Sequence, residues 1–544
     1  MTNKEIANTF AKLGKIMALH DENPFKSKSY ANAYLTIRNL AEPLAEMEAE
    51  EISQLRGVGK AISDKINELL GTGELQTLNK YLDMTPPGVV EMMAIKGFGP
   101  KKIKVIWKEL GVESPGELLY ACHENRLVEL KGFGTKTQDS LIKQINYFLD
   151  SKGKFLYASV ADIAQELVDV LSEELPEYRF EVTGEVRRKL PIINSIEIIT
   201  DFDDNMEEEM IAFGLEELTI EDEELYYRSY PFSFIQVAPE EFYEELVCSS
   251  SSEEFRTAIQ KELKEDGDSE RSIFESNKLQ YVEPELREDP KTVELSKQNK
   301  IPVLIKESDI KGVIHTHTNY SDGQNTLTQM ATATKEKGYE YILITDHSKA
   351  AFYANGLQVE RVHQQLDEID MLNKKMSDFR IFKGIESDIL NNGDLDYEED
   401  ILQQFDVIIA SVHSNLKMDE EKANKRLIKA IENPYTRILG HPTGRLLLSR
   451  EGYPIDHQKI IDACAANGVA IELNANPNRL DMDYTWIPYA VDKGVLISIN
   501  PDAHSISGID DIRWGVAAAR KGGLLAEQCL NTMNREVFTS WISD

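Results

Sequence analysis

The sequence predicts a multidomain protein with an all-α N-terminal third, an α+β middle third and a C-terminal distorted (β/α)7 barrel. A chain of 544 residues is too long for one compact core, so several domains are expected. Three G-x-G segments, each followed by a helical pattern, lie between residues 55 and 141. Seven short apolar runs alternate with helical patterns between residues 311 and 504, which is typical of parallel βαβ units.

The composition is that of a globular protein, with 41% hydrophobic and 28% charged residues. No apolar run reaches the ~18 residues that a membrane span requires, and the N-terminus lacks a secretory apolar core. We therefore expect a cytoplasmic, monomeric protein without a membrane partner. The four cysteines are scattered and form no C-x-x-C pair, which argues against a disulfide framework and a zinc–thiolate site.

The negative charge is unevenly distributed along the chain. The formal net charge of −34 divides into −1 for residues 1–150, −22 for residues 151–300 and −11 for residues 301–544. A uniformly acidic protein would repel phosphate. The N-terminal third is nearly neutral, so a local basic patch there can still bind nucleic acid.

The N-terminal third contains one pattern three times: LRGVGKAISDKI (55–66), IKGFGPKKIKVI (95–106) and LKGFGTKTQDSL (130–141). The glycines allow a tight turn between helices and the close approach of a phosphate, which the N–H groups of the following helix can bind. The pattern resembles the helix-hairpin-helix motif, which binds DNA without reading its sequence. One G-x-G could be a mere helix–helix turn, but three copies favour DNA. The predicted contacts are Gly57, Gly59, Lys60, Gly97, Gly99, Lys101, Lys102, Gly132, Gly134 and Lys136.

The segment NPFKSKSYANAY (23–34) resembles the opening helix of the small N-terminal domain in family X DNA polymerases. That domain grips the 5′ side of a DNA gap, and the resemblance implies contacts from Lys26, Lys28 and Tyr30. The alternative is an ordinary amphipathic helix with solvated lysines.

The middle third resembles a family X palm and thumb that has lost its metal ligands. FEVTGEVRRKLPIINSIEIIT (180–200) matches the Gly-Ser-x-Arg-Arg segment and the Asp-x-Asp strand of such palms, yet Ser195 and Glu197 stand where the first two aspartates are expected. Ser233 stands in place of the third. Two-metal nucleotidyl transfer needs anionic ligands. We therefore expect a degenerate polymerase site and lost polymerase activity, unless Asp201 or Asp203 serves instead.

The C-terminal third has its polar residues at the ends of the predicted strands. In barrels of parallel βα units the chemistry lies at the C-terminal ends of the strands, and six of the ten histidines fall there. Imidazoles and carboxylates are ligands for Zn²⁺, Mn²⁺ or Fe²⁺, and nine ligands predict a cluster of two or three ions, most simply Mn or Zn. Glu386 is the expected bridge and a catalytic residue. The predicted ligands are His315, His317, Asp322, His347, Glu386, His413, His441, Asp502 and His504.

The motifs HTHTNYSDG, ITDHS, GIESD, SVHS, GHPTGR and PDAH resemble, in order, those of the polymerase-and-histidinol-phosphatase (PHP) domain of bacterial family X polymerases. Arg445 and Arg479 follow the fifth and sixth strands, and each is a candidate catalytic clamp on a phosphate or an ordinary surface ion pair. The resulting expected domains are 1–82 and 83–153 (helical, with hairpins), 154–245 (palm), 246–300 (thumb and linker) and 301–544 (PHP).

Similar domains in family X enzymes act as 3′–5′ exonucleases, and some act as abasic-site endonucleases or 3′-phosphatases. The resemblance therefore implies a metal-dependent DNA phosphoesterase of base excision or related DNA repair, acting on gapped DNA or 3′ ends. Three alternatives stay open: an active gap-filling polymerase, a histidinol-phosphatase-like small-molecule phosphatase and a non-enzymatic DNA-binding scaffold. The hairpins argue against the second, and the filled ligand positions argue against the third.

Overall fold

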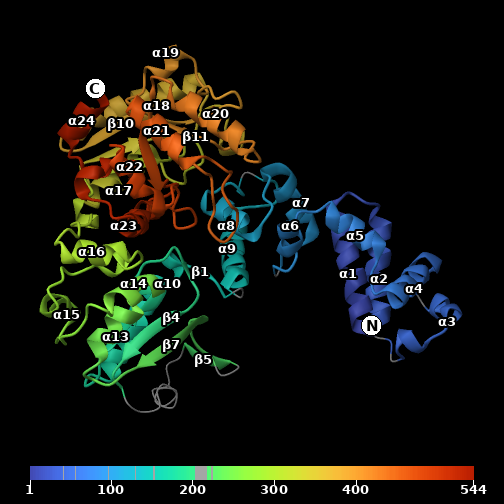
Figure 1. The fold of residues 1–544 in the computed structure, drawn as a ribbon. Coiled ribbons are helices and arrows are strands. Elements are labelled where there is room, and N and C mark those ends of the chain that lie inside the picture. The colour runs from blue at the N-terminus through green and yellow to red at the C-terminus, as the bar shows by residue number, and fades with distance from the viewer. Residues whose placement is uncertain are drawn as a thin grey trace. The chain divides into compact units, whose positions relative to one another are not determined.

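The computed structural model divides into two compact units, which are described separately (Figure 1). The first unit comprises residues 1–122 and 127–149, and the second comprises residues 123–126 and 150–544. The structure describes the whole chain except residues 39, 41, 56, 96, 129, 151–152, 203–216, 222–223 and 544.

The first unit is helical, as predicted. Its helices are α1 (Asn3–Leu19), α2 (Pro24–Arg38), α3 (Ala49–Gln54), α4 (Lys60–Thr72), α5 (Gln76–Asp83), α6 (Pro87–Met92), α7 (Pro100–Val105), α8 (Pro115–His123) and α9 (Thr135–Asp150). The helices from α1 to α5 bury one apolar core around Phe10, Ile37 and Ile66. A second core around Ile103 and Ile145 joins the helices from α6 to α9.

The three G-x-G segments form similar turns. The first glycine of each has a positive φ, +86° at Gly57, +76° at Gly97 and +95° at Gly132, a conformation that glycine adopts without strain. The apolar residue after it is buried, and a helix begins just beyond the second glycine: α4, α7 and α9 respectively. The third segment differs from the expected turn between two helices. α8 ends at His123, and the described residues between it and this segment form turns rather than a helix.

The palm of the second unit is a five-stranded sheet packed on a long helix. The strand order is β2-β4-β7-β6-β5, in which β4 and β7 are parallel and the other pairs antiparallel. Its elements are β1 (Phe155–Leu156), α10 (Tyr157–Glu174), β2 (Phe180–Thr183), α11 (Gly184–Arg187), β3 (Ile192–Ile193), β4 (Ile196–Thr200), β5 (Leu218–Glu221), β6 (Glu224–Tyr227) and β7 (Tyr230–Gln236). Four thumb helices follow, namely α13 (Phe242–Ser249), α14 (Glu253–Ile259), α15 (Glu270–Ser276) and α16 (Lys291–Lys297).

Seven parallel strands in sequence order, β8 to β14, build the C-terminal barrel. They are β8 (Gly312–Thr316), β9 (Tyr341–Ile344), β10 (Arg380–Asp388), β11 (Val407–Ser411), β12 (Thr436–Leu439), β13 (Ala470–Asn474) and β14 (Ile497–Asn500). The helices are α17 (Leu327–Glu336), α18 (Val359–Lys375), α19 (Glu399–Leu402), α20 (Glu420–Ile431), α21 (His457–Asn467), α22 (Ile487–Asp492), α23 (Ile512–Lys521) and α24 (Arg535–Ser543). A bridge between Thr316 and Ala503 links the first strand to the end of the last, so the barrel nearly closes and the predicted fold class is confirmed.

The barrel interior is filled by side chains at one end and polar at the other. Near the N-terminal ends of the strands, Phe538 of α24 stacks on Tyr341 at 4.6 Å and packs edge-on against Phe382 at 5.0 Å. These apolar groups fill that end of the barrel. The opposite end, where the strands finish, is therefore the one available for a functional site.

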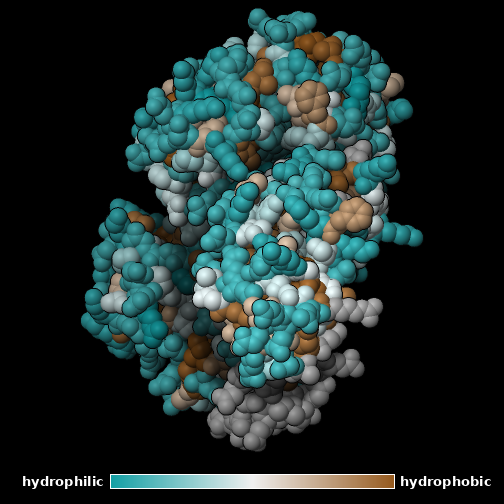
Figure 2. All heavy atoms as spheres, turned by 90° about the vertical axis from the view of Figure 1, so that its right-hand side faces the viewer, coloured by the Kyte–Doolittle hydropathy of each residue, from teal (hydrophilic) through white to brown (hydrophobic). Residues whose placement is uncertain are grey.

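The face drawn in Figure 2 is mostly hydrophilic, with hydrophobic side chains in small groups. Among the described residues, no helix combines the length and the apolar character needed to cross a membrane.

Candidate metal centre

The structure brings all nine predicted ligands together at the C-terminal ends of the barrel strands. Seven of them are buried, and the side chains of Asp322 and His413 are each only 6% exposed. Eight of them, all except His441, form three groups whose ligand atoms lie within 4.8 Å of one another. These are His317 with Asp322, His347 and His504; His315 with His317 and Asp502; and His347 with Glu386 and His413.

His317 and His347 each belong to two of these groups, so the three groups form one continuous cluster. His441 joins it through Nε2, which lies 3.1 Å from Oε1 of Glu386. The same carboxylate lies 3.3 Å from Nε2 of His315. Glu386 thus stands at the meeting point expected of a bridging ligand.

The donor atoms fit metal ions better than they fit one another. Nδ1 of His347 lies 2.8 Å from Oε2 of Glu386, yet neither atom makes a hydrogen bond of acceptable geometry. Buried atoms in the same state include Nε2 of His315, both Oδ atoms of Asp322 and Nε2 of His504. Buried polar atoms are normally hydrogen-bonded. A set of such atoms, all nitrogen or carboxylate oxygen, is what divalent cations of the Zn²⁺ or Mn²⁺ type would satisfy.

An unusual backbone conformation positions the side chains of two of the candidate ligands. His315 and Asp502 have φ values of +66° and +52°, in the left-handed region that side chains other than glycine rarely adopt. Their neighbours are tied together, because the His317 N–H donates to the Ala503 carbonyl at 2.9 Å. The closing strands of the barrel thus hold both ligands in conformations that a free chain would avoid.

Charge complementarity inside the cluster is strong. Burial opposes ionisation, but nearby imidazoles outweigh it and hold the pKa values of Asp322, Glu386 and Asp502 well below the usual range. The carboxylates in turn outweigh the burial of His413 and His504 and raise the pKa of each to about 9. For His317, burial and the neighbouring His504 and His347 lower the pKa. The carboxylates are therefore ionised and ready to bind cations.

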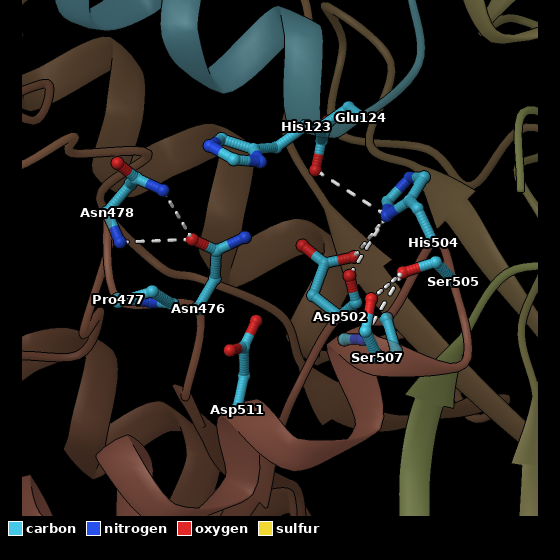
Figure 3. Close-up of a pocket in the computed structure, with 12 residues that line it drawn as sticks. His123, Glu124, Asn476, Pro477, Asn478, Asp502, His504, Ser505, Ser507 and Asp511 are labelled. Atoms are coloured by element: carbon cyan, nitrogen blue, oxygen red, sulfur yellow. Dashed lines mark hydrogen bonds and ion pairs between the residues drawn. The ribbon is translucent and has the colours of Figure 1, made fainter. Parts of the chain in front are cut away.

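Three residues around the ligands were not predicted from the sequence. Glu472 on β13 is fully buried and lies 2.6 Å from Nδ1 of His315, which leaves Nε2 of that ring to face the cluster. Oδ1 of Asp388 lies 3.2 Å from Nδ1 of His413. Oε1 of Glu124, which belongs to the second unit, lies 3.7 Å from Nδ1 of His504 (Figure 3). Asp388 follows Glu386 by two residues, so strand periodicity could have revealed it. Glu124 lies far away in sequence and gave no signal.

The predicted arginine clamps do not have the free guanidinium groups that we expected. Arg445 is bound to Asp483 and to the carbonyls of Arg479 and Leu480, so its donors serve the fold of this loop. Arg479 is only 3% exposed and lies close enough to Glu124 to lower the pKa of that carboxyl. Of the two alternatives for Arg445, the structure shows the ion pair, with Asp483.

The predicted DNA contacts of the first unit divide into two classes. The lysines of the hairpins and of α2 are exposed, namely Lys60, Lys101, Lys102, Lys136, Lys26 and Lys28. An added Cβ at Gly59, Gly99 or Gly134 would meet no atom within 4 Å, so the backbone there is open to a ligand. Tyr30 is different, because its ring is 8% exposed and stacks on Phe10 at 5.9 Å. The prediction that Tyr30 contacts DNA is contradicted by its burial in the helical core.

The structure places the predicted palm residues on or next to two neighbouring strands. Glu197 on β4 pairs directly with Ser233 on β7, and Ser195 lies two residues before Glu197. Glu197 packs on Gly184, where an added Cβ would lie 1.7 Å from its Oε2. Burial and the neighbouring Glu185 raise the pKa of Glu197, although Arg188 lowers it. Asp201 is bound to Arg179 by its side chain at 2.8 Å, and Asp203 lies outside the described residues.

Comparison with known proteins supports the division of the chain. A PHP domain model matches residues 314–476, a helix-hairpin-helix domain model matches residues 1–75 and a SAM-like helix-hairpin-helix tandem model matches residues 89–146. The DNA polymerase/3′-5′ exonuclease PolX of Bacillus subtilis is 33% identical over 98% of this chain and 97% of its own length.

The chain belongs to the PolX family. Two shorter relatives match a part of it. A probable phosphatase of Thermoanaerobacter sp. (strain X514) is 30% identical over 40% of this chain and 89% of its own length. A probable phosphatase of Syntrophotalea carbinolica is 24% identical over a similar share. Part of this chain is thus similar to shorter proteins that are named probable phosphatases.

Proposed function

We propose that this PolX protein is a DNA phosphoesterase that removes nucleotides or blocking groups from 3′ ends during repair, and that its polymerase site no longer adds nucleotides. The observation that carries the proposal is the cluster of nine candidate ligand residues at the barrel mouth, several of whose buried nitrogen and carboxylate oxygen atoms have no hydrogen-bond partner. The B. subtilis relative is named a 3′-5′ exonuclease, and the helix-hairpin-helix matches supply a means of holding DNA.

His315, His317, Asp322, His347, Glu386, His413, His441, Asp502 and His504 would hold two or three divalent ions. Such ions, Mn or Zn, would supply Lewis-acid activation of water and of the phosphoryl group. Glu472 and Asp388 orient the imidazoles of His315 and His413 through Nδ1. Glu386 would act as an ionised ligand of these ions rather than as a proton carrier, because the surrounding imidazoles keep its pKa low.

Two features support the loss of polymerisation. The palm pairs a glutamate with a serine where two-metal transfer needs anionic ligands, so Glu197 alone would have to hold both ions. The two palm arginines are also engaged. Arg187 forms a bidentate pair with Glu270 at 3.0 and 2.6 Å, and Arg188 donates from Nη1 to both carboxylate oxygens of Glu288 at 3.0 and 2.8 Å. These arginines stabilise the palm–thumb contact and are not free for a triphosphate.

A small-molecule phosphatase is the second candidate. The observation that favours it is the likeness of part of the chain to two probable phosphatases. The hairpins favour DNA as the substrate, because an enzyme that acts on a small metabolite does not need three turns that bind DNA phosphates.

The test is a gel assay with a 5′-labelled primer annealed to form a short gap, with Mn²⁺, with and without dNTPs. Wild type is expected to shorten the primer or remove a 3′-phosphate, and to give no extension. His317→Ala should abolish this activity, because His317 belongs to two ligand groups. His363→Ala, an exposed histidine on α18, is the matched control and should behave as wild type. Primer extension by dNTPs in both wild type and His317→Ala would show that the palm is an active polymerase. Hydrolysis of histidinol phosphate without action on the primer would favour the metabolite phosphatase.

A further inference from the structure

A pocket of about 260 Å³ lies directly beside the candidate metal centre (Figure 3). The ligands Asp502 and His504 form part of its wall. Asn476 lines it from the segment after β13, and Asp511 lines it from the start of α23. A group in this pocket therefore lies within reach of a phosphodiester that is held at the metal cluster.

Asp511 occupies a helix N-terminus, where an aspartate usually serves to cap the helix. It is the N-cap residue of α23, where an aspartate commonly accepts a hydrogen bond from a backbone N–H of the first turn. The side chain of Asp511 makes no such bond. Figure 3 shows its carboxyl directed into the pocket, toward the gap between Asn476 and Asp502. Capping thus does not account for this residue.

The surroundings of Asp511 favour the protonated carboxyl. A helix N-terminus normally favours the ionised form. Here burial is the larger effect and raises the pKa of Asp511 to about 7; Arg513 lowers it and Asp510 raises it. Arg513 is itself paired with Asp162 at 2.8 Å. The titratable groups on the other walls are His123, Glu124, Asp502 and His504.

We propose that Asp511 is the proton donor to the oxygen that leaves when the phosphodiester is cut, an inference that rests on the proposed function. In this step the oxygen of water bonds to phosphorus, the bond between phosphorus and the 3′-oxygen breaks, and the Asp511 proton passes to that oxygen. The proton released by water goes to solvent, and the Asp511 carboxylate then takes up a proton from solvent.

The test compares two substrates that differ in their need for a proton. One is primer DNA with a 3′ end, whose leaving group is an alkoxide. The other is the p-nitrophenyl ester of thymidine 5′-monophosphate, whose phenolate leaves without protonation. With Mn²⁺ present, Asp511→Asn should lower kcat on DNA about 100-fold or more and kcat on the ester less than about threefold. The decline of the wild-type rate on DNA above pH ~7 should also disappear in the variant.

Asp510→Asn is the matched control, because Asp510 is exposed and paired with Lys337 at 2.6 Å. It should leave both rates unchanged. Equal losses of Asp511→Asn on both substrates, or full activity on DNA, would overturn the inference. A wild type inactive on both substrates would instead overturn the proposed function.

A measurement without metal gives an independent readout. The infrared difference between wild type and Asp511→Asn at pH ~6 should contain one protonated carboxyl that is lost by pH ~8. If no carboxyl titrates between these pH values, Asp511 has no proton to donate at neutral pH and the inference is wrong.

Discussion

The carboxylate of Glu386 contacts four of the candidate histidine ligands. Its carboxylate lies within 3.3 Å of His315, His347, His413 and His441. One residue thus links histidines from four different strands, and its charge is the main attraction for cations at the centre of the cluster.

Glu386→Gln should therefore lower the number of bound Mn²⁺ ions by at least one per chain while the protein stays folded. The amide cannot bridge two cations, and it removes a negative charge. Metal content is measured by elemental analysis after dialysis against Mn²⁺. Asp394→Asn, which removes an exposed carboxylate paired with Lys429, is the control and should keep the full content. Unchanged metal content in Glu386→Gln would rule out a bridging role.

At the scale of elements, ion pairs join the palm, the thumb and the barrel. Glu288 of the thumb region binds Arg188 of the palm and also Lys521 of α23, at 2.5 Å. Glu285 binds Lys189 of the palm at 2.8 Å and Arg520 of α23 at 2.7 Å. Through these contacts the palm and thumb segments are bound to the barrel.

Glu285→Gln should lower the stability of the second unit by about 3 kcal/mol at neutral pH. Burial opposes ionisation, but Lys189 and Arg520 outweigh it and lower the pKa of Glu285 from 4.5 to about 2. Because the folded-state pKa is depressed, this stability is present above pH 4.5 and is lost as the pH falls toward 2.

Urea unfolding at pH 7 and at pH 3 measures the difference between wild type and Glu285→Gln. It should shrink at the lower pH. Glu283→Gln is the control, because Glu283 is 39% exposed and 4.0 Å from Arg520. A difference that is equal at both pH values would show that packing, not charge, explains the loss.

The hairpins are the elements that should bind DNA. Replacing Lys60, Lys101 and Lys136 together by alanine should weaken binding to gapped DNA about equally for all sequences. It should also reduce the salt dependence, since each phosphate contact contributes to the salt slope. Fluorescence anisotropy at several salt concentrations measures both effects. Lys12→Ala with Lys15→Ala, on exposed positions of α1, should change neither. An unchanged salt slope in the triple variant would exclude the hairpins as the binding surface.

At the scale of the molecule, two compact units with separate apolar cores make up the chain. Such units commonly unfold independently. Differential scanning calorimetry should therefore show two transitions. Addition of Mn²⁺ should raise only the transition of the second unit, because a ligand stabilises the unit that binds it. EDTA should reverse the shift. A single transition would contradict this independence. Two transitions that both shift on addition of Mn²⁺ would contradict it as well.

The sequence alone determined the features that depend on short-range periodicity. Strands that end in histidine or a carboxylate must place those groups at one end of a parallel barrel, so the nine candidate ligands could be named from their positions in the sequence. The G-x-G turns were equally local, since each depends on a few adjacent residues.

Only the tertiary structure decided which groups surround these residues. Tyr30 looked like a surface contact but faces the helical core, and Arg445 looked like a clamp but is held by Asp483. Glu124 reaches His504 across 380 positions of sequence, which no local pattern reveals. Asp511 occupies a cap position yet points into a pocket. Burial and partner choice depend on contacts between distant segments, and these are fixed only when the chain has folded.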